Sequence, residues 1–275
     1  MDIADIALAL ALVGVGTFAA TYGSLVGAGG GFVVVPILIF LSPESSPALL
    51  TAISLTGILM TGLSGTWAYH RLGLIDYRSG LAFAVPGIPG AILGVIVVHQ
   101  IDPYLFCIAF GALLLVTGTF LLLHPRHHGD STGQRGVSHR RIEDRQGNVY
   151  EYRFNLLLGL AANFVVGILK ALFGIGGGLI FTPFAIAVLG FPTLVATATS
   201  VFTLTFTTAA AVLSHAATGS FAEGSLRLLP VALGMAVGGQ LGPRLARRVG
   251  GIFVVRLLAV TLMVMGATMV VRQLF

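Results

Sequence analysis

VGAGGGFVVVPI (residues 26–37) and FGIGGGLIFTPF (residues 173–184) are two versions of one motif in a chain of 275 residues. Each version sets three consecutive glycines between apolar runs and places a proline five residues after the third glycine. The second version begins 147 positions after the first, and TAISL (51–55) returns as TATSV (197–201) 146 positions later. An internal duplication of this length is typical of membrane transporters.

The composition indicates that lipid rather than water surrounds most of the chain. Hydrophobic residues make up 56% of it, charged residues only 9%, and the mean hydropathy is +0.97. A soluble domain carries about 25% charged residues, so this chain lacks the charge to cover a water-exposed surface. The net charge of +5 does not indicate a nucleic-acid partner, because the arginines cluster beside apolar segments. We predict a multi-pass protein of the cell (plasma) membrane, with the lipid bilayer as a partner.

Apolar runs separated by short polar breaks predict an all-α integral membrane protein with about 8–10 transmembrane helices. Two tandem repeats of about five hydrophobic segments each are expected, with broken helices at the two glycine motifs. The first repeat covers residues 1–123, a basic and flexible cytoplasmic linker covers 124–153, and the second repeat covers 154–275. The runs lie at about 6–28, 31–42, 48–69, 79–99 and 103–123, and again at about 155–174, 178–191, 194–215, 226–243 and 250–271.

The distribution of basic residues bears on how the two repeats are oriented. If every run crosses the membrane, the repeats are inverted, and twelve arginines lie on the cytoplasmic side with two on the other. If the short runs 31–42 and 178–191 do not cross, the repeats are parallel and the division becomes ten to four. The inverted arrangement fits the excess of cytoplasmic positive charge better. It predicts that both termini are extracytoplasmic.

The glycine motifs form the centre of the predicted substrate site. Glycine permits a sharp break, and the helix that follows begins with N–H groups that have no intrahelical partner. Together with the positive end of the helix dipole, these groups can bind an anion without a formal charge. Close helix packing is the alternative role, whereas a dinucleotide fingerprint would need a soluble βαβ unit. The predicted substrate-binding glycines are Gly29, Gly30, Gly31, Gly176, Gly177 and Gly178.

Three polar residues complete the predicted substrate site. Ser54 and Ser200 are equivalent in the two repeats, and their hydroxyls can donate to substrate oxygens, although helical hydroxyls more often bond their own backbone. Lys170 lies within an apolar run, where a lysine costs about 2.5–3.5 kcal/mol to insert. Such a lysine normally faces a cavity or a partner, or else extends its amine to the membrane surface.

His70 and His215 end corresponding segments of the two repeats. Histidine titrates near neutrality, so both are candidates for carrying a coupling proton. The alternative is that they are interfacial bystanders.

No metal, cofactor or catalytic residue is predicted. The linker histidines His124, His127, His128 and His139 fit no standard zinc spacing, and Cys107 is the only cysteine. The chain contains no HExxH motif, and we expect a protein that is not an enzyme. The expected partner is a small anion; a carrier or channel for a different solute and, less readily, a membrane-embedded enzyme remain alternatives.

The chain resembles the sulfite exporter TauE/SafE family, also called the toluene-sulfonate uptake permeases. The resemblance covers nearly the whole chain and rests on VGAGGGFVVVPIL (26–38), FGIGGGLIFTPF (173–184) and the Ser54 and Ser200 regions. It implies membrane transport of sulfite, sulfonates or related organosulfur anions, coupled to an ion. The basic linker and Lys170 are not carried over from the family.

Overall fold

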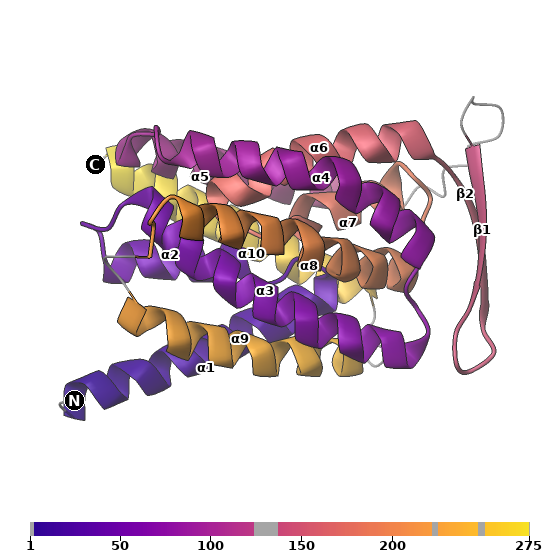
Figure 1. Ribbon diagram of the computed structural model, residues 1–275, viewed down its shortest axis with the longest axis horizontal. Coiled ribbons are helices and arrows are strands. Elements are labelled where there is room, and N and C mark those ends of the chain that lie inside the picture. Colours follow the sequence, from indigo (N-terminus) through magenta and orange to yellow (C-terminus); the bar gives the residue numbers. More distant parts are fainter. Residues whose placement is uncertain (1–2, 124–136, 222–224, 247–250, 275) are drawn as a thin grey trace.

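The computed structural model describes residues 3–123, 137–221, 225–246 and 251–274. Within these residues the first half of the chain forms five helices, a β-hairpin follows, and the second half forms five more helices (Figure 1). The first five are α1 (Ile3–Val26), α2 (Gly31–Leu41), α3 (Pro47–Leu72), α4 (Tyr77–Val98) and α5 (Pro103–Leu123). The hairpin consists of β1 (Val137–Glu143) and β2 (Val149–Asn155). The last five are α6 (Leu156–Phe173), α7 (Gly178–Ala187), α8 (Thr193–Ala217), α9 (Ser225–Ala246) and α10 (Gly251–Leu274).

Local sequence signals determine where several helices begin and end. Side-chain oxygens of Ser46, Asp76 and Asn155 accept first-turn N–H groups of α3, α4 and α6. Gly73 ends α3 with φ 73° and Gly174 ends α6 with φ 65°, a conformation that glycine adopts without a Cβ penalty.

The predicted helix breaks at the two glycine motifs are present. The helices that follow them, α2 and α7, have 11 and 10 residues. At 1.5 Å per residue each is about 16 Å long, roughly half the thickness of a hydrocarbon core. Neither α2 nor α7 is therefore long enough to cross that core as a single straight helix.

Six helices are long and apolar enough to cross a membrane, among the residues that the structure describes. These are α3, α4, α5, α6, α8 and, from Ala7 onward, α1. The chain is thus a mostly helical protein built for several membrane crossings.

The helices run along one direction in a bundle, and the hairpin covers one end of it (Figure 1). We call that end the hairpin end and the opposite end, where α1 begins and α10 ends, the far end. The N–H of Arg145 donates to the carbonyl of Leu72, 3.3 Å away, which places the end of α3 at the hairpin end. At the far end, His99 after α4 contacts Ser220 after α8.

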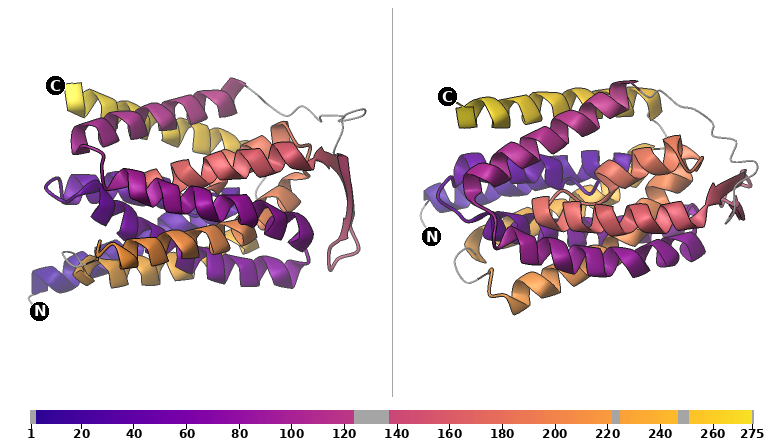
Figure 2. Two further views of the ribbon diagram at one scale, coloured as in Figure 1. Left: turned by 45° about the horizontal axis from the view of Figure 1, so that its top comes forward. Right: turned by 90° about the horizontal axis from the view of Figure 1, so that it is seen from above.

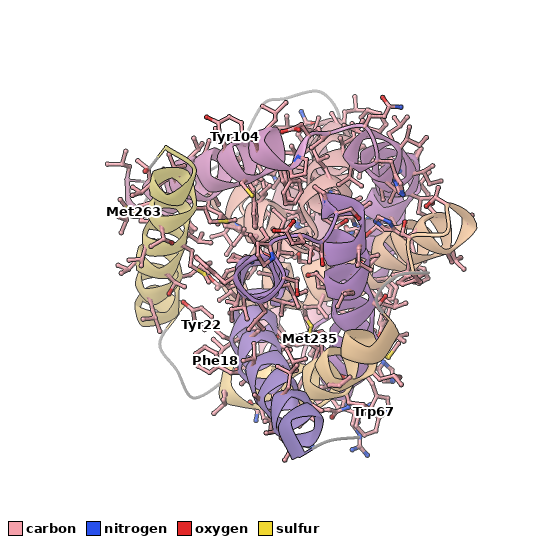
Figure 3. The ribbon with its side chains drawn as sticks, turned by 90° about the vertical axis from the view of Figure 1, so that its left-hand side faces the viewer. Phe18, Tyr22, Trp67, Tyr104, Met235 and Met263 are labelled. Atoms are coloured by element: carbon pink, nitrogen blue, oxygen red, sulfur yellow. The ribbon has the colours of Figure 1, made fainter. Side chains whose placement is uncertain are left out.

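The principal helix pairs join the two halves of the chain. Helix α1 packs on α9 and α6 packs on α4, while α3 packs on α8 and α5 packs on α10 (Figure 2). Figure 3, a view from the far end, shows Met235 of α9 inside this arrangement and Trp67 of α3 on the outside. The Met235 side chain fills the space beside Gly57, where an added Cβ would lie 2.2 Å from its sulfur.

The second part of the predicted linker is structured. A flexible linker is predicted over 124–153, whereas residues 137–155 form the hairpin and residues 124–136 lie outside the described residues. Tyr152 and Phe154 point from β2 into an aromatic cluster with Phe83 and Phe191. Alternating aromatic residues in VYEYRFN are favoured in a strand with one buried face.

A buried polar contact also anchors the hairpin. The hydroxyl of Tyr152 donates to Asp76 Oδ2 at 2.8 Å, and Arg140 Nε lies 3.5 Å from the same oxygen. Burial, with the neighbouring Asp76 carboxylate, raises the pKa of Tyr152, so its hydroxyl stays protonated and remains a donor. The hairpin is therefore fixed to the start of α4.

Candidate functional site

The two glycine breaks lie against each other inside the bundle. Gly178, at the start of α7, contacts the carbonyl oxygen of Gly27, and Gly31, at the start of α2, contacts the carbonyl oxygen of Gly174. A Cβ on either glycine would overlap the facing main chain. All residues from Gly27 to Gly31 and from Gly174 to Gly178 are buried. The six predicted glycines thus belong to one composite site.

Each of the two predicted serines holds the break of the opposite half. Ser54 Oγ of α3 donates to the Gly174 carbonyl at 2.7 Å, and Ser200 Oγ of α8 donates to the Gly27 carbonyl at 3.4 Å. Both side chains are therefore at the site. A hydroxyl has one proton to donate, so in this conformation neither serine has a donor left for a substrate.

The amides of the breaks supply unengaged donors. Main-chain bonds engage the N–H groups of Gly27 and Ala28 before α2, and of Gly174 and Ile175 before α7. Within the described residues, six further amides have no hydrogen-bond acceptor, those of Gly29, Gly30, Gly31, Gly176, Gly177 and Gly178. Buried N–H groups are costly when they have no acceptor, so this cluster favours a ligand with acceptor oxygens.

Lys170 places a buried amine beside the second break. It is 3% exposed, and its Nζ donates to Thr207 Oγ1 of α8. A Cβ on Gly177 would lie 3.0 Å from Lys170 Cδ and 3.8 Å from its Nζ. The ion pairs of the described residues are Arg140–Asp76 and Arg141–Glu151, so neither neutralises Lys170. An anion bound at the breaks would do so.

Thr182 is a site residue that sequence reasoning missed. It is 2% exposed, and its Oγ1 has no hydrogen-bond partner among the described residues. A Cβ on Gly27 would lie 2.6 Å from this oxygen, so the hydroxyl faces the first break. Alignment of the two motifs contained the signal, because Thr182 stands where the first motif has Val35.

The two predicted histidines lie away from the breaks, at opposite ends of the bundle. His70 is exposed at the hairpin end, where its Nδ1 lies 2.6 Å from the hydroxyl of Tyr77. His215 is buried at the far end, where its Nδ1 lies 3.0 Å from Ser220 Oγ. The structure therefore brings the predicted glycines, serines and lysine together but not the histidines.

Comparison with known proteins identifies a family that this chain matches. The family described as sulfite exporter TauE/SafE matches residues 12–269. A probable membrane transporter protein, YunE of Bacillus subtilis (strain 168), is 33% identical over 270 residues, which cover 96% of this chain and 98% of that protein.

More distant relatives carry similar names. A probable membrane transporter protein of Methanocaldococcus jannaschii is 25% identical over 74% of this chain and 71% of its own length. One of Xylella fastidiosa (strain Temecula1) is 26% identical over 62% of this chain and 59% of its own length. No solved structure gives a significant match to the chain.

Proposed function

Because the chain belongs to the sulfite exporter TauE/SafE family of membrane transporters, we propose that it is a secondary carrier for a small sulfur oxyanion. Sulfite, sulfonates and other organosulfur oxyanions are the substrate class. The proposed binding residues are the six break glycines, Lys170 and Thr182, with Ser54 and Ser200 holding the breaks in place.

One observation carries the proposal: the buried amine of Lys170, which has no carboxylate partner, lies beside a cluster of unengaged amides. Leaving such a charge unpaired inside a membrane is expensive, and nearby oxygens of an anion would offset the cost. Amides at helix starts bind oxyanions through several oxygens at once. An anion would accept from these amides and would also stabilise the protonated form of Lys170, so the chemistry favours an anion.

Alternating access would follow from an inverted relation between the halves. Replacing each helix by its counterpart in the other half gives the same set of principal helix pairs. The α1–α9 pair corresponds to α6–α4, and the α3–α9 pair corresponds to α8–α4. The α3–α8 and α5–α10 pairs each correspond to themselves. Helix α1 starts at the far end and α2 returns there, so this pair adds no crossing and α3 to α5 supply three (Figure 1). An odd number of crossings places the two halves in opposite orientations in the membrane. Three crossings per half therefore support an inverted repeat as well as the five that the sequence analysis assumed.

The proposed orientation places the hairpin end in the cytoplasm of a plasma-membrane protein. Arginines concentrate at that end, with Arg71 and Arg78 beside the α3–α4 turn and Arg140, Arg141, Arg145 and Arg153 on the hairpin. Cytoplasmic segments close to membrane helices carry such an excess of positive charge.

Uptake into proteoliposomes tests the proposed function. Labelled sulfite, thiosulfate and a small sulfonate would be offered with and without a proton gradient, with phosphate and an amino acid as competitors. Selective uptake of a sulfur oxyanion that unlabelled sulfite competes away is the expected result. Uptake of the amino acid or of phosphate in preference would contradict the proposed substrate class.

A further inference from the structure

A second polar cluster lies at the far end, away from the breaks. His99 follows α4 and is exposed, His215 is buried in the last turn of α8, and their ring centroids are 5.6 Å apart. Ser220 lies between them, with its Oγ 2.9 Å from His99 Nε2 and 3.0 Å from His215 Nδ1. The cluster joins two residues that are 121 positions apart in the chain, His99 and Ser220.

The hydrogen-bond geometry fixes the protons of this cluster when both rings are neutral. His99 Nδ1 lies 2.7 Å from the Val95 carbonyl oxygen, which can only accept, so Nδ1 carries a proton. His99 Nε2 is then an acceptor and takes the proton of the Ser220 hydroxyl. Ser220 Oγ then accepts from His215 Nδ1–H. The Thr218 hydroxyl, 3.1 Å from Ser220 Oγ, donates to the carbonyl oxygens of Ser214 and His215. The remaining nitrogen, His215 Nε2, therefore has a bare lone pair.

That lone pair is buried and unsatisfied. His215 is 0% exposed, and its Nε2 has no hydrogen-bond partner among the described residues. His215 shares the buried side of α8 with Thr207, the acceptor for Lys170. The two residues are eight positions apart, or about 12 Å along the helix. The free nitrogen thus belongs to the helix that lines the proposed substrate site.

At the equivalent position in the first half, the polar atom of the side chain is hydrogen-bonded. Tyr69 corresponds to His215 at the 146-residue spacing, and its buried hydroxyl donates to the Ser24 carbonyl at 3.0 Å. The first half therefore has a satisfied donor where the second half has an open acceptor.

We infer that His215, Ser220 and His99 form a proton relay between the interior and the far end, coupled to the proposed carrier. A proton that binds His215 Nε2 lets His215 Nδ1–H pass to Ser220 Oγ, while the Ser220 proton passes to His99 Nε2. His99 becomes the imidazolium and releases one proton at the far end. His215 is left with its proton on Nε2. The reverse steps reset it while the carrier interior is open to the far end, so that the Nε2 proton leaves on that side and one proton crosses the membrane in each transport cycle. One proton moves, and only N–H and O–H bonds change.

Other titratable groups on the helices packed against α8 are distinct from this cluster. Helix α6 contributes Lys170, bound to Thr207, and α7 contains no charged residue or histidine. Helix α3 contributes Tyr69, His70 and Arg71 at the hairpin end, and α4 contributes Tyr77 and Arg78 there. Helix α1 contributes Tyr22, while the side chains of Asp5, Glu223 and Arg227 lie outside those the structure describes.

Gradient-driven uptake and substrate counterflow separate the relay from the carrier itself. In proteoliposomes with labelled sulfite, His215→Gln, His99→Gln and Ser220→Ala should each lower proton-driven accumulation by about tenfold or more and leave counterflow intact. Ser220→Thr, which keeps a hydroxyl, should restore accumulation, and His139→Gln on the exposed face of β1 should change nothing.

The outcomes distinguish the two proposals. Absence of wild-type counterflow with every sulfur anion would contradict the carrier, whereas full proton-driven accumulation by His215→Gln would overturn the relay alone. Equal loss of counterflow in the three variants would assign these residues to packing and also overturn the relay. Loss of coupling in His70→Gln but not in His215→Gln would place the proton at the other end.

A spectroscopic measurement tests the relay without any substrate. In protein labelled with ¹⁵N-histidine, assigned with the His99→Gln and His215→Gln variants, both rings should be Nδ1–H tautomers when neutral. A neutral His215 that carries its proton on Nε2 would overturn the arrangement.

Discussion

The two glycine breaks have the same backbone plan but differ in their side chains. In both, the first helix ends in a glycine with positive φ, and a serine from the opposite half binds that glycine's carbonyl oxygen. The second break adds Lys170 and Thr182, where the first half has Gly23 and Val35. Duplication therefore supplies the frame of the site, and the second half alone supplies its charge and its unpartnered hydroxyl.

Removing the close approach between the breaks should have the largest effect. A Cβ added by Gly178→Ala or Gly31→Ala would meet the facing main chain, which cannot move aside as a side chain could. Overpacking of this kind costs about 1–3 kcal/mol or more, and we expect a lower melting temperature and no uptake from either variant. Gly14→Ala is the matched control, since its Cβ would meet nothing within 4 Å. Normal stability and uptake of both variants would disprove the contact between the breaks.

Removing the Lys170 amine from the second break should weaken substrate binding without unfolding the protein. Lys170→Met keeps a long unbranched side chain but removes the charge. Loss of a charge-assisted contact should weaken sulfite binding by about tenfold to a hundredfold. The melting temperature should stay the same or rise, because a buried charge without a carboxylate partner is removed. Unchanged uptake, measured together with the melting temperature, would show that Lys170 does not face the substrate.

Single substitutions at the equivalent positions 35 and 182 test whether the second break contributes more to substrate binding than the first. Thr182→Val removes only the unpartnered hydroxyl and should raise the KM for sulfite by about tenfold, with little change in maximal rate. Val35→Thr, its counterpart in the first half, should leave the KM unchanged or lower it. Equal increases in KM for both variants would mean that the two breaks contribute alike.

Removing the hydrogen bonds of the two serines should have the smallest effects, and these should differ in size between the two serines. Hydrogen bonds between membrane helices average about 0.6 kcal/mol. Ser54→Ala should lower the melting temperature more than Ser200→Ala, because the Ser54 bond is 2.7 Å long and the Ser200 bond 3.4 Å. The reverse order in a thermal unfolding assay would contradict the geometry of the two breaks.

The framework of the site could be predicted because the duplication is visible in the sequence. The 147-residue spacing identified both breaks, and the equivalent positions of Ser54 and Ser200 singled out the two residues that bind them. The place of Lys170 in an apolar run left two alternatives, a buried amine or one that reaches the membrane surface, and the structure shows it buried. These features depend on local pattern and on the repeat, both of which a single sequence contains.

Other features depend on contacts between distant segments and could not be predicted. His99 and His215 meet only because α4 and α8 end side by side, and their partner Ser220 lies in a turn. The hairpin was not predicted because the sequence around it is rich in histidine, arginine and glycine. Its aromatic side chains pack against residues of α4 and of the segment after α7, which are distant in the sequence. Thr182 would have been identified by looking for positions at which the two glycine motifs differ, rather than for those at which they agree.

Locating a bound anion tests the central claim most directly. Selenite, a heavier counterpart of sulfite, can be diffused into crystals of the protein and found by its anomalous scattering. We predict one selenium peak between the breaks, within hydrogen-bond distance of the Gly177 amide or Lys170 Nζ, and no such peak in Lys170→Met crystals. Selenium bound elsewhere in the bundle, with the breaks still closed on each other, would contradict it.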